Sequence, residues 1–145
     1  MKVYISGKIG EEVISDATRQ KFARAEKMLE AKGYDVFNPT DPEWQFIQSR
    51  CFDREKGNEL FTYMPMPNDW YSYILLKDLR KLALCDAIYM LADWEYSPGS
   101  NVELDFAQAT GKKLFWEAEI DSKIFCDENG NYIGEWLPIE EVSGV

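Results

Sequence analysis

Residues 74–109 constrain the fold of this 145-residue chain more than any other stretch. The first part predicts an amphipathic helix over residues 70–84, because apolar side chains recur there at helical spacing. The predicted apolar stripe consists of Leu76, Leu79, Leu82 and Ala83. A helix that is followed closely by a strand and a second helix is typical of an α/β sandwich.

The second part of this stretch predicts a buried strand and the loop after it. Residues 87–91 are an apolar run between two aspartates, which is typical of a strand buried on both faces. Ser-Pro-Gly at 97–99 then breaks the chain before a helix predicted over 101–110. In open parallel sheets, ligands bind at the carboxyl ends of the strands. We therefore expect the loop 92–99 to line a ligand site, with Glu103 in the first turn of the helix that follows.

The rest of the chain completes a parallel sheet. A long helix is predicted over 15–32, and strands are predicted over 2–6, 34–37 and 113–116. The order β-α-β-(insertion)-α-β-α-β predicts a single α/β domain over residues 1–145. We expect a three-layer sandwich with a flavodoxin-like or Rossmann-like parallel sheet.

Two segments fall outside this scheme. Residues 41–69 are a strongly aromatic insertion, which we interpret either as a short helix with a flap over the crevice or against a partner subunit, or as an enlargement of the core. Residues 124–136 are typical of a β-hairpin with Asn129-Gly130 as a type I′ turn. A calcium loop is the poorer interpretation, because Tyr132 and Pro138 stand where such a loop needs glycine and glutamate.

The charge of the chain limits its partners. With 16 basic and 26 acidic residues the formal net charge is −10, which repels nucleic-acid backbones and anionic lipids. We therefore expect no nucleic-acid polymer as a partner, although a few main-chain N–H groups can still hold a single phosphate. No apolar run reaches the roughly 20 residues of a membrane span. Three widely spaced cysteines and no signal peptide indicate a cytoplasmic protein with reduced thiols.

The sequence contains no histidine. This excludes His-dependent triads and removes the commonest metal ligand, so we expect neither a metal site nor a cofactor. Any catalysis has to use carboxylates, hydroxyls, amines or thiols, and carboxylates are the most numerous of these.

Three residues are candidates for chemistry, and each has a structural alternative. Ser100 and Glu103 fit a capping box, in which the serine caps the helix and the glutamate reaches back to the serine N–H. Alternatively, the helix dipole keeps the Glu103 carboxylate ionised, so that it can attack a sugar carbon with oxocarbenium character. Asp78 is either a solvated charge paired with Lys81 at i+3 or a site residue. Tyr4 lies inside the first predicted strand, where core packing is the default.

Four sequence motifs connect the chain to a known superfamily. They are MKVYISG at the start, Lys77-Asp78-Leu79, Cys85-Asp86-Ala87-Ile88-Tyr89, and Ser97-Pro98-Gly99 followed by Glu103-Leu104 and Ala107. In this order and spacing they resemble the nucleoside 2-deoxyribosyltransferase-like superfamily, which includes 2′-deoxynucleoside 5′-phosphate N-hydrolases. The resemblance covers residues 1–38 and 70–116, and the most similar members are small bacterial and phage relatives of unknown function.

The resemblance implies an activity and a set of site residues. The activity is cleavage or transfer at the N-glycosidic bond of a (deoxy)nucleoside or nucleoside 5′-monophosphate, without metal or cofactor. Glu103 would be the nucleophile, Asp78 would protonate the departing base, and Tyr4 would orient the glutamate. The substrate would be bound by Ser6, Gly7, Lys8, Ser97 and Gly99.

Some alternatives stay open. The first loop is Gly7-Lys8-Ile9-Gly10, where the hydrolases place a serine and an arginine around the 5′-phosphate, so either Lys8 supplies the charge or no phosphate is bound. The glycine pair alone is also typical of a tight turn. A non-catalytic nucleotide-binding or regulatory module on the same fold is the alternative function. The aromatic content of residues 41–73 exceeds what one small domain readily buries, which predicts a homo-oligomer, most simply a dimer.

Overall fold

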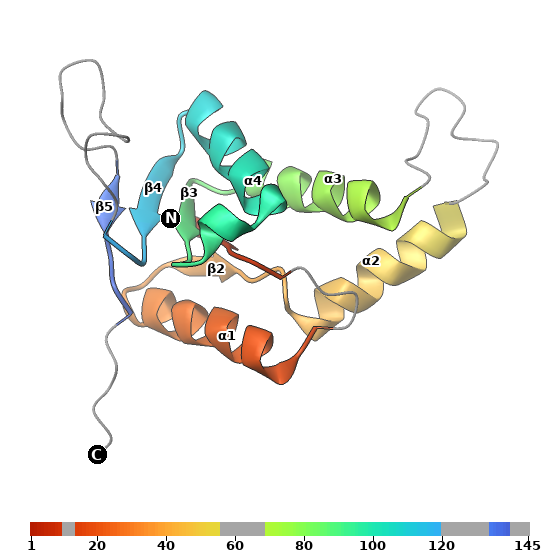
Figure 1. Ribbon diagram of the computed structural model, residues 1–145, viewed down its shortest axis with the longest axis horizontal. Coiled ribbons are helices and arrows are strands. Elements are labelled where there is room, and N and C mark those ends of the chain that lie inside the picture. The colour runs from red at the N-terminus through yellow and green to blue at the C-terminus, as the bar shows by residue number, and fades with distance from the viewer. Residues whose placement is uncertain (10–13, 56–68, 120–133, 140–145) are drawn as a thin grey trace.

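The computed structural model describes residues 1–9, 14–55, 69–119 and 134–139 (Figure 1). In chain order the elements are β1 (Lys2–Ser6), α1 (Asp16–Ala31), β2 (Asp35–Phe37), α2 (Pro42–Glu55), α3 (Trp70–Ala83), β3 (Ala87–Met90), the short 3-10 helix η2 (Trp94–Tyr96), α4 (Pro98–Ala109), β4 (Lys113–Trp116) and β5 (Glu135–Trp136). The strands predicted over 2–6 and 113–116 are confirmed with the same bounds.

The five strands form one parallel sheet in the order β2-β1-β3-β4-β5. This is the strand order of the flavodoxin-like doubly wound fold, so the predicted fold class is confirmed. The order reverses between β1 and β3, where Tyr4 pairs with Ile88 and Ser6 pairs with Met90. Ligands bind at such a switch point, at the carboxyl ends of the two strands.

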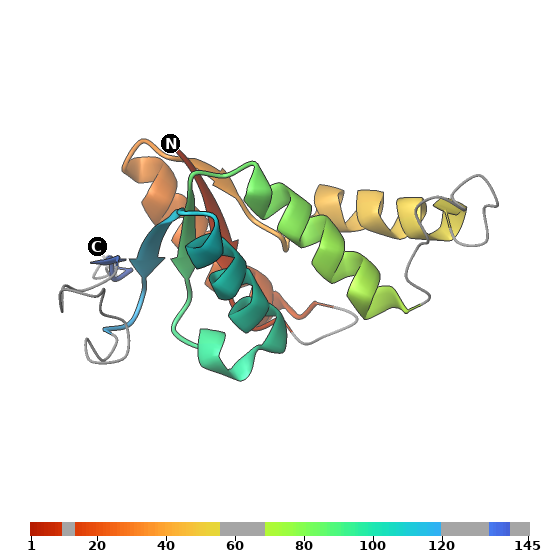
Figure 2. The same ribbon diagram turned by 90° about the horizontal axis from the view of Figure 1, so that it is seen from above.

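Helices cover both faces of the sheet (Figures 1 and 2). On one face, Phe22, Ala25 and Leu29 of α1 pack against Val3 and Ile5 of β1. On the other face, α3 and α4 pack against a cluster that includes Tyr4. Successive side chains of a strand point to opposite faces, so Tyr4 and Ser6 share the face that α3 and α4 cover.

α4 begins three residues earlier than predicted. The sequence interpretation took Ser-Pro-Gly as a breaker before a helix starting at residue 101, whereas α4 starts at Pro98. Ser97 is the N-cap, because its Oγ accepts the N–H of Ser100 at 3.1 Å. Proline suits the first helical position, since its missing N–H would have no partner inside the helix.

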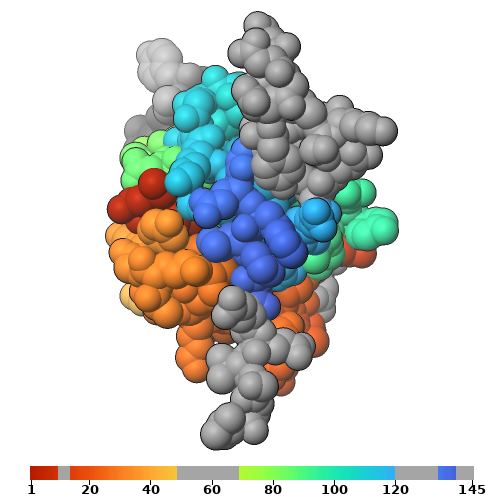
Figure 3. Space-filling model, turned by 90° about the vertical axis from the view of Figure 1, so that its left-hand side faces the viewer, coloured from red at the N-terminus to blue at the C-terminus, as the bar shows by residue number. Residues whose placement is uncertain are grey.

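The two segments outside the predicted scheme behave differently. The insertion contains α2, a 14-residue helix that extends beyond the sheet beside α3 (Figure 2), while the flap falls on residues 56–68, outside the described part. The hairpin turn at 129–130 also lies outside it. The described end of this segment, β5, joins the sheet in parallel with β4. Figure 3 shows residues 134–139 in blue beside the orange α1, and Leu137 and Ile139 pack on the α1 face of the core.

Candidate active site

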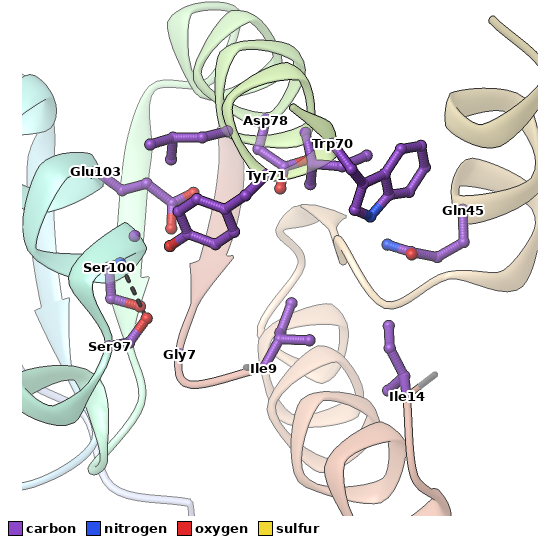
Figure 4. A pocket seen from close by; sticks show the side chains of 13 residues that line it. Gly7, Ile9, Ile14, Gln45, Trp70, Tyr71, Asp78, Ser97, Ser100 and Glu103 are labelled. Atoms are coloured by element: carbon purple, nitrogen blue, oxygen red, sulfur yellow. Dashed lines mark hydrogen bonds between the residues drawn. The ribbon is translucent and has the colours of Figure 1, made fainter. Parts of the chain in front are cut away.

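A cavity of about 300 Å³ lies at the switch point, within the size range of small-molecule sites (Figure 4). Its walls come from the β1–α1 loop, from α2 and α3, and from the first two turns of α4. The lining residues are Gly7, Ile9, Ile14, Gln45, Trp70, Tyr71, Ile74, Leu75, Asp78, Ser97, Gly99, Ser100 and Glu103. Five of the eight residues predicted for the site are among them: Glu103, Asp78, Gly7, Ser97 and Gly99.

Glu103 is held by two hydroxyl donors from β1. The Tyr4 hydroxyl donates to Oε2 of Glu103, and Ser6 Oγ donates to Oε1 at 2.9 Å. All three side chains are buried. Tyr4 and Ser6 point to the same face of the sheet because they are two residues apart in a strand. The predicted contact between Tyr4 and Glu103 is therefore present, and Ser6 contacts the same carboxylate without lining the cavity.

The capping-box interpretation of Glu103 is wrong. Ser97, not Ser100, is the N-cap of α4, so Glu103 lies in the second turn rather than the first. Ser100 is buried inside the helix, and its Oγ has no hydrogen-bond partner among the described residues. Both carboxylate oxygens of Glu103 face β1 instead of the start of the helix.

Asp78 is buried, with only 8% of its surface exposed, and is not a solvated helix charge. Its Oδ1 accepts hydrogen bonds from Trp44 Nε1 at 3.1 Å and from Gln48 Nε2 at 3.0 Å. Lys81, the expected ion-pair partner, instead places its ammonium group 4.9 Å from the ring centre of Trp44. Trp44 and Gln48 are one turn apart on α2, so both reach the same atom. The sequence interpretation missed both residues.

Burial raises the pKa of both carboxyl groups. The pKa of Glu103 rises to about 8, first because the group is desolvated and then because Asp78 is close; the hydrogen bonds from Tyr4 and Ser6 oppose this rise. The pKa of Asp78 rises to about 7 through desolvation, against the donors Trp44 and Gln48. The expectation that the helix dipole keeps Glu103 ionised is therefore wrong, because the residue lies beyond the first turn of α4 and burial raises its pKa. The pKa of Tyr4 is raised well above its ordinary value, mainly by burial, so the phenol stays a donor at neutral pH.

The two predicted glycines fit tightly where they stand. A Cβ on Gly7 would lie 2.5 Å from Leu91 Cδ1 and 2.9 Å from Leu91 Cβ, which forces the loop or the strand end to move. A Cβ on Gly99 would lie 3.0 Å from the Tyr71 hydroxyl oxygen. A side chain at Gly7, after β1, would therefore collide with Leu91, and one at Gly99, in the first turn of α4, would crowd Tyr71.

Lys8 does not line the cavity, and its side chain is exposed. Its main chain is held by neighbouring side chains: the N–H donates to Asp93 Oδ1 at 3.1 Å, and the carbonyl accepts from Lys21 Nζ at 2.8 Å. The structure thus gives no support to Lys8 as a side chain that contacts the substrate.

A second stripe of α3 faces the cavity, and the sequence interpretation missed most of it. Tyr71, Ile74, Leu75 and Asp78 follow the i, i+3, i+4, i+7 spacing of one helical face and all line the cavity. The predicted core stripe is only partly correct. Leu82 is fully buried, but Leu76 is 56% exposed and Ala83 is also exposed.

Within the described ranges, no group of three or more His, Cys, Asp or Glu side chains is arranged to hold a metal ion. None of the helices in those ranges has the length and apolar composition needed to cross a membrane.

The fold is nucleoside 2-deoxyribosyltransferase-like. A 2-deoxyribosyltransferase from Bacillus psychrosaccharolyticus matches with a TM-score of 0.53 and 15% sequence identity, over 94% of this chain and 100% of that chain. A CMP N-glycosidase from Clostridium botulinum matches with a TM-score of 0.38 and 19% identity, over 80% of this chain and 67% of that chain. The sequence has no significant match among curated proteins.

Residues 1–116 match the family described as a domain of unknown function, DUF4406. The chain belongs to this family, and the matched region ends with β4.

Proposed function

We propose that the protein cleaves the N-glycosidic bond of a nucleoside and passes the sugar to water or to another base. Glu103 is the nucleophile and Asp78 is the general acid. One observation carries this proposal: the Glu103 carboxylate is fixed by Tyr4 and Ser6 in a cavity that a second buried carboxyl group, Asp78, also lines. Enzymes that break glycosidic bonds commonly use a pair of carboxyl groups. A solved structure of the same fold is a 2-deoxyribosyltransferase, which agrees with this chemistry.

The hydrogen bonds divide the roles between the two carboxyl groups. Both oxygens of Glu103 accept a hydroxyl donor, which favours the carboxylate form at that residue. Asp78 accepts both of its donors at Oδ1, so its proton belongs on Oδ2. With pKa values of about 7 for Asp78 and about 8 for Glu103, the pair holds one proton near neutral pH, more often on Glu103. The productive state is the less populated form, in which the proton has moved to Asp78 and Glu103 is ionised.

The reaction then follows in two balanced steps. In the first, a Glu103 oxygen attacks the anomeric carbon, the bond to the base nitrogen breaks, and Asp78 gives its proton to the departing base. In the second, water or another base attacks the same carbon, the ester bond to Glu103 breaks, and Asp78 takes the proton of the attacking group. Tyr4 and Ser6 hold the carboxylate throughout, which keeps the nucleophile in its attacking position.

The apolar side of the cavity suits a nucleobase. Trp70 and Tyr71 line it at the start of α3, next to Ile74 and Leu75, and offer flat rings and methyl groups to a planar ligand (Figure 4). Asp78 lies one to two turns further along the same helix. A base that contacts this wall therefore leaves beside the proton donor.

The test is incubation with a panel of nucleosides and 5′-mononucleotides, each with and without a free second base. Released base alone identifies a hydrolase, and an exchanged base identifies a transferase. If compounds bind but no member of the panel is turned over, the enzyme assignment is contradicted and a non-catalytic nucleotide-binding module is supported.

We also propose that the protein is a homodimer. Phe46 and Ile47 of α2 are 60% and 44% exposed, on a helix that extends beyond the sheet. Burial of these exposed apolar side chains of α2 against a second copy of the chain would be favourable. Light scattering at micromolar concentration should give twice the 16.9 kDa of one chain; a monomer would contradict this proposal.

A further inference from the structure

Asp93 binds two positively polarised groups next to the cavity residues Gly7 and Ile9, in an arrangement that has the chemistry of an anion site. Its Oδ1 accepts the main-chain N–H of Lys8 at 3.1 Å, and its Oδ2 lies 2.5 Å from Lys21 Nζ. The same ammonium group donates to the Lys8 carbonyl at 2.8 Å. The contacts join α1, the β1–α1 loop and the segment after β3, beside the cavity residues Gly7 and Ile9.

A main-chain N–H of a glycine-containing loop and a lysine ammonium are the groups that hold a phosphate in many nucleotide sites. Here both groups already bind a carboxylate of the chain itself. Neither Lys8 nor Asp93 lines the cavity, and the Lys8 N–H already has Asp93 as its acceptor. The Lys8 N–H and the Lys21 ammonium group are therefore bound to Asp93 and not offered to a substrate.

The start of α4 has little left to offer an anion. Pro98 has no N–H, and the N–H of Ser100 donates to Ser97 Oγ. In the first turn this leaves an incoming phosphate at most the N–H of Gly99. Arg19 of α1 does not line the cavity either, and its guanidinium group donates to the Thr40 carbonyl at 2.5 Å.

The charges that do line the cavity are negative. Among the described lining residues the acidic side chains are Asp78 and Glu103, and no lysine or arginine is present. In the described parts of the β1–α1 loop, the side chains that line the cavity are the apolar Ile9 and Ile14. A 5′-phosphate brings a charge of about −1.5 to −2 at neutral pH. It would be placed next to two carboxyl groups, and none of the lining residues that the structure describes supplies a cation to bind it.

We propose that Asp93 is a specificity residue that excludes a 5′-phosphate, so that the substrate is an unphosphorylated nucleoside. This inference rests on the proposed function and chooses between the two substrate classes, nucleosides and nucleoside 5′-monophosphates. The uncharged 5′-hydroxyl needs no cation, and apolar or hydroxyl-lined walls accommodate it.

The experiment compares a 2′-deoxynucleoside with its own 5′-monophosphate, so that base and sugar are the same. The enzymes are the wild type, Asp93→Asn and Glu95→Gln. Glu95 is exposed two residues after Asp93, so Glu95→Gln makes the same change in net charge without touching the Lys8 and Lys21 contacts. kcat/KM is measured for both substrates, together with Kd by calorimetry in a Glu103→Gln background, where turnover does not interfere.

The wild type should favour the nucleoside by about tenfold or more in kcat/KM and in Kd. Asp93→Asn leaves Lys21 without its counter-ion, so it should tighten binding of the monophosphate and leave the nucleoside unchanged. Glu95→Gln should alter neither. Preference of the wild type for the monophosphate, or equal effects of Asp93→Asn and Glu95→Gln, would overturn the inference.

The Kd comparison keeps the two proposals separate. If neither compound is turned over but the nucleoside binds more tightly, the proposed reaction is wrong and the specificity inference stands. If the monophosphate is turned over faster, the reaction stands and the inference is wrong. Binding of neither compound would contradict both. The wild-type comparison needs no variant, so an Asp93→Asn protein that fails to fold does not remove the test.

Discussion

Glu103 owes its environment to three residues that are far apart in the sequence. Tyr4 and Ser6 donate to its two oxygens, and Asp78 supplies a second negative charge nearby. Desolvation favours the protonated acid, whereas the two hydroxyl donors favour the anion. The balance places the proton equilibrium of the pair near neutral pH, where small changes in the hydrogen bonds decide whether Glu103 can attack.

The pH dependence of kcat/KM follows from this balance. The active form carries one proton on the carboxyl pair, so the rate should rise as the first proton leaves and fall as the second leaves. We expect a bell-shaped profile with its maximum between the pKa values of about 7 and about 8. Steady-state rates from pH 5 to 10 check this, and a profile that is flat from pH 5 to 7 would contradict it.

Tyr4→Phe removes one donor from Glu103 and leaves the ring that stacks on Phe37, at 5.5 Å between ring centres. The pKa of Glu103 should rise further, so the rate maximum should move to higher pH and fall by about 10- to 100-fold, as for the loss of a hydrogen bond to a charged group. Tyr89→Phe is the matched control, since its hydroxyl donates to the Leu137 carbonyl on the other face of the sheet. A normal pH profile for Tyr4→Phe would show that its hydroxyl does not tune the carboxylate.

At the scale of the elements, the site depends on where α4 begins. The segment Ser97-Pro98-Gly99-Ser100 contains two serines that can each cap a helix, and the structure uses the first. A start at Pro98 turns Glu103 toward β1, where Tyr4 and Ser6 meet it. The start of one helix thus determines which side chains form the site.

Alanine substitutions distinguish the two serines. Ser97→Ala should destabilise the protein by about 1 kcal/mol, because it removes the acceptor for the Ser100 N–H. Ser100→Ala should be neutral or slightly stabilising, because it removes a buried hydroxyl that has no hydrogen-bond partner in the described part of the chain. Urea denaturation of both variants gives the answer; the opposite ranking would mean that α4 starts at the second serine.

Local sequence patterns predicted the elements better than their contacts. Strand composition and helical spacing were enough for β1, β3, β4 and α3, and motif order was enough to single out Glu103 and Asp78. The contacts of Asp78 with Trp44 and Gln48 were not predictable, because they depend on how α2 packs on α3. The exposed Leu76 has a related cause: α3 divides its surface between a core stripe and a cavity stripe, and leucines occur on both. β5 has only two residues, too few for a periodic pattern.

At the scale of the whole molecule, the buried carboxyl pair makes stability depend on pH. The pKa of Glu103 rises from 4.5 to about 8 on folding, and that of Asp78 rises from 3.8 to about 7. Below about pH 4 both groups are protonated in the folded and the unfolded chain. Above about pH 4 the unfolded chain releases protons that the folded chain keeps. The contribution of the two protonated carboxyl groups to stability is therefore lost as pH rises through about 8.

Replacing Glu103 by the uncharged glutamine should remove its part of the stability loss at high pH. The free energy of unfolding of Glu103→Gln minus that of the wild type should increase by a few kcal/mol between pH 5 and pH 8.5. The variant is thus stabilised relative to the wild type as pH rises, and one pKa unit is worth about 1.4 kcal/mol. Chemical denaturation at both pH values measures it. Glu95→Gln makes the same chemical change at an exposed position and serves as the control. A difference for Glu103→Gln that does not vary with pH would contradict the raised pKa.

The central claim is that Glu103 attacks the sugar, and the single-turnover rate of Glu103→Gln tests it most directly. Glutamine keeps the size of the side chain and an oxygen that can accept from Tyr4 or Ser6, but it lacks the charged oxygen that forms the bond. We predict cleavage slower by about three orders of magnitude or more with nucleoside binding retained, because only transition-state stabilisation is lost. A Glu103→Gln protein that cleaves near the wild-type rate would contradict the account.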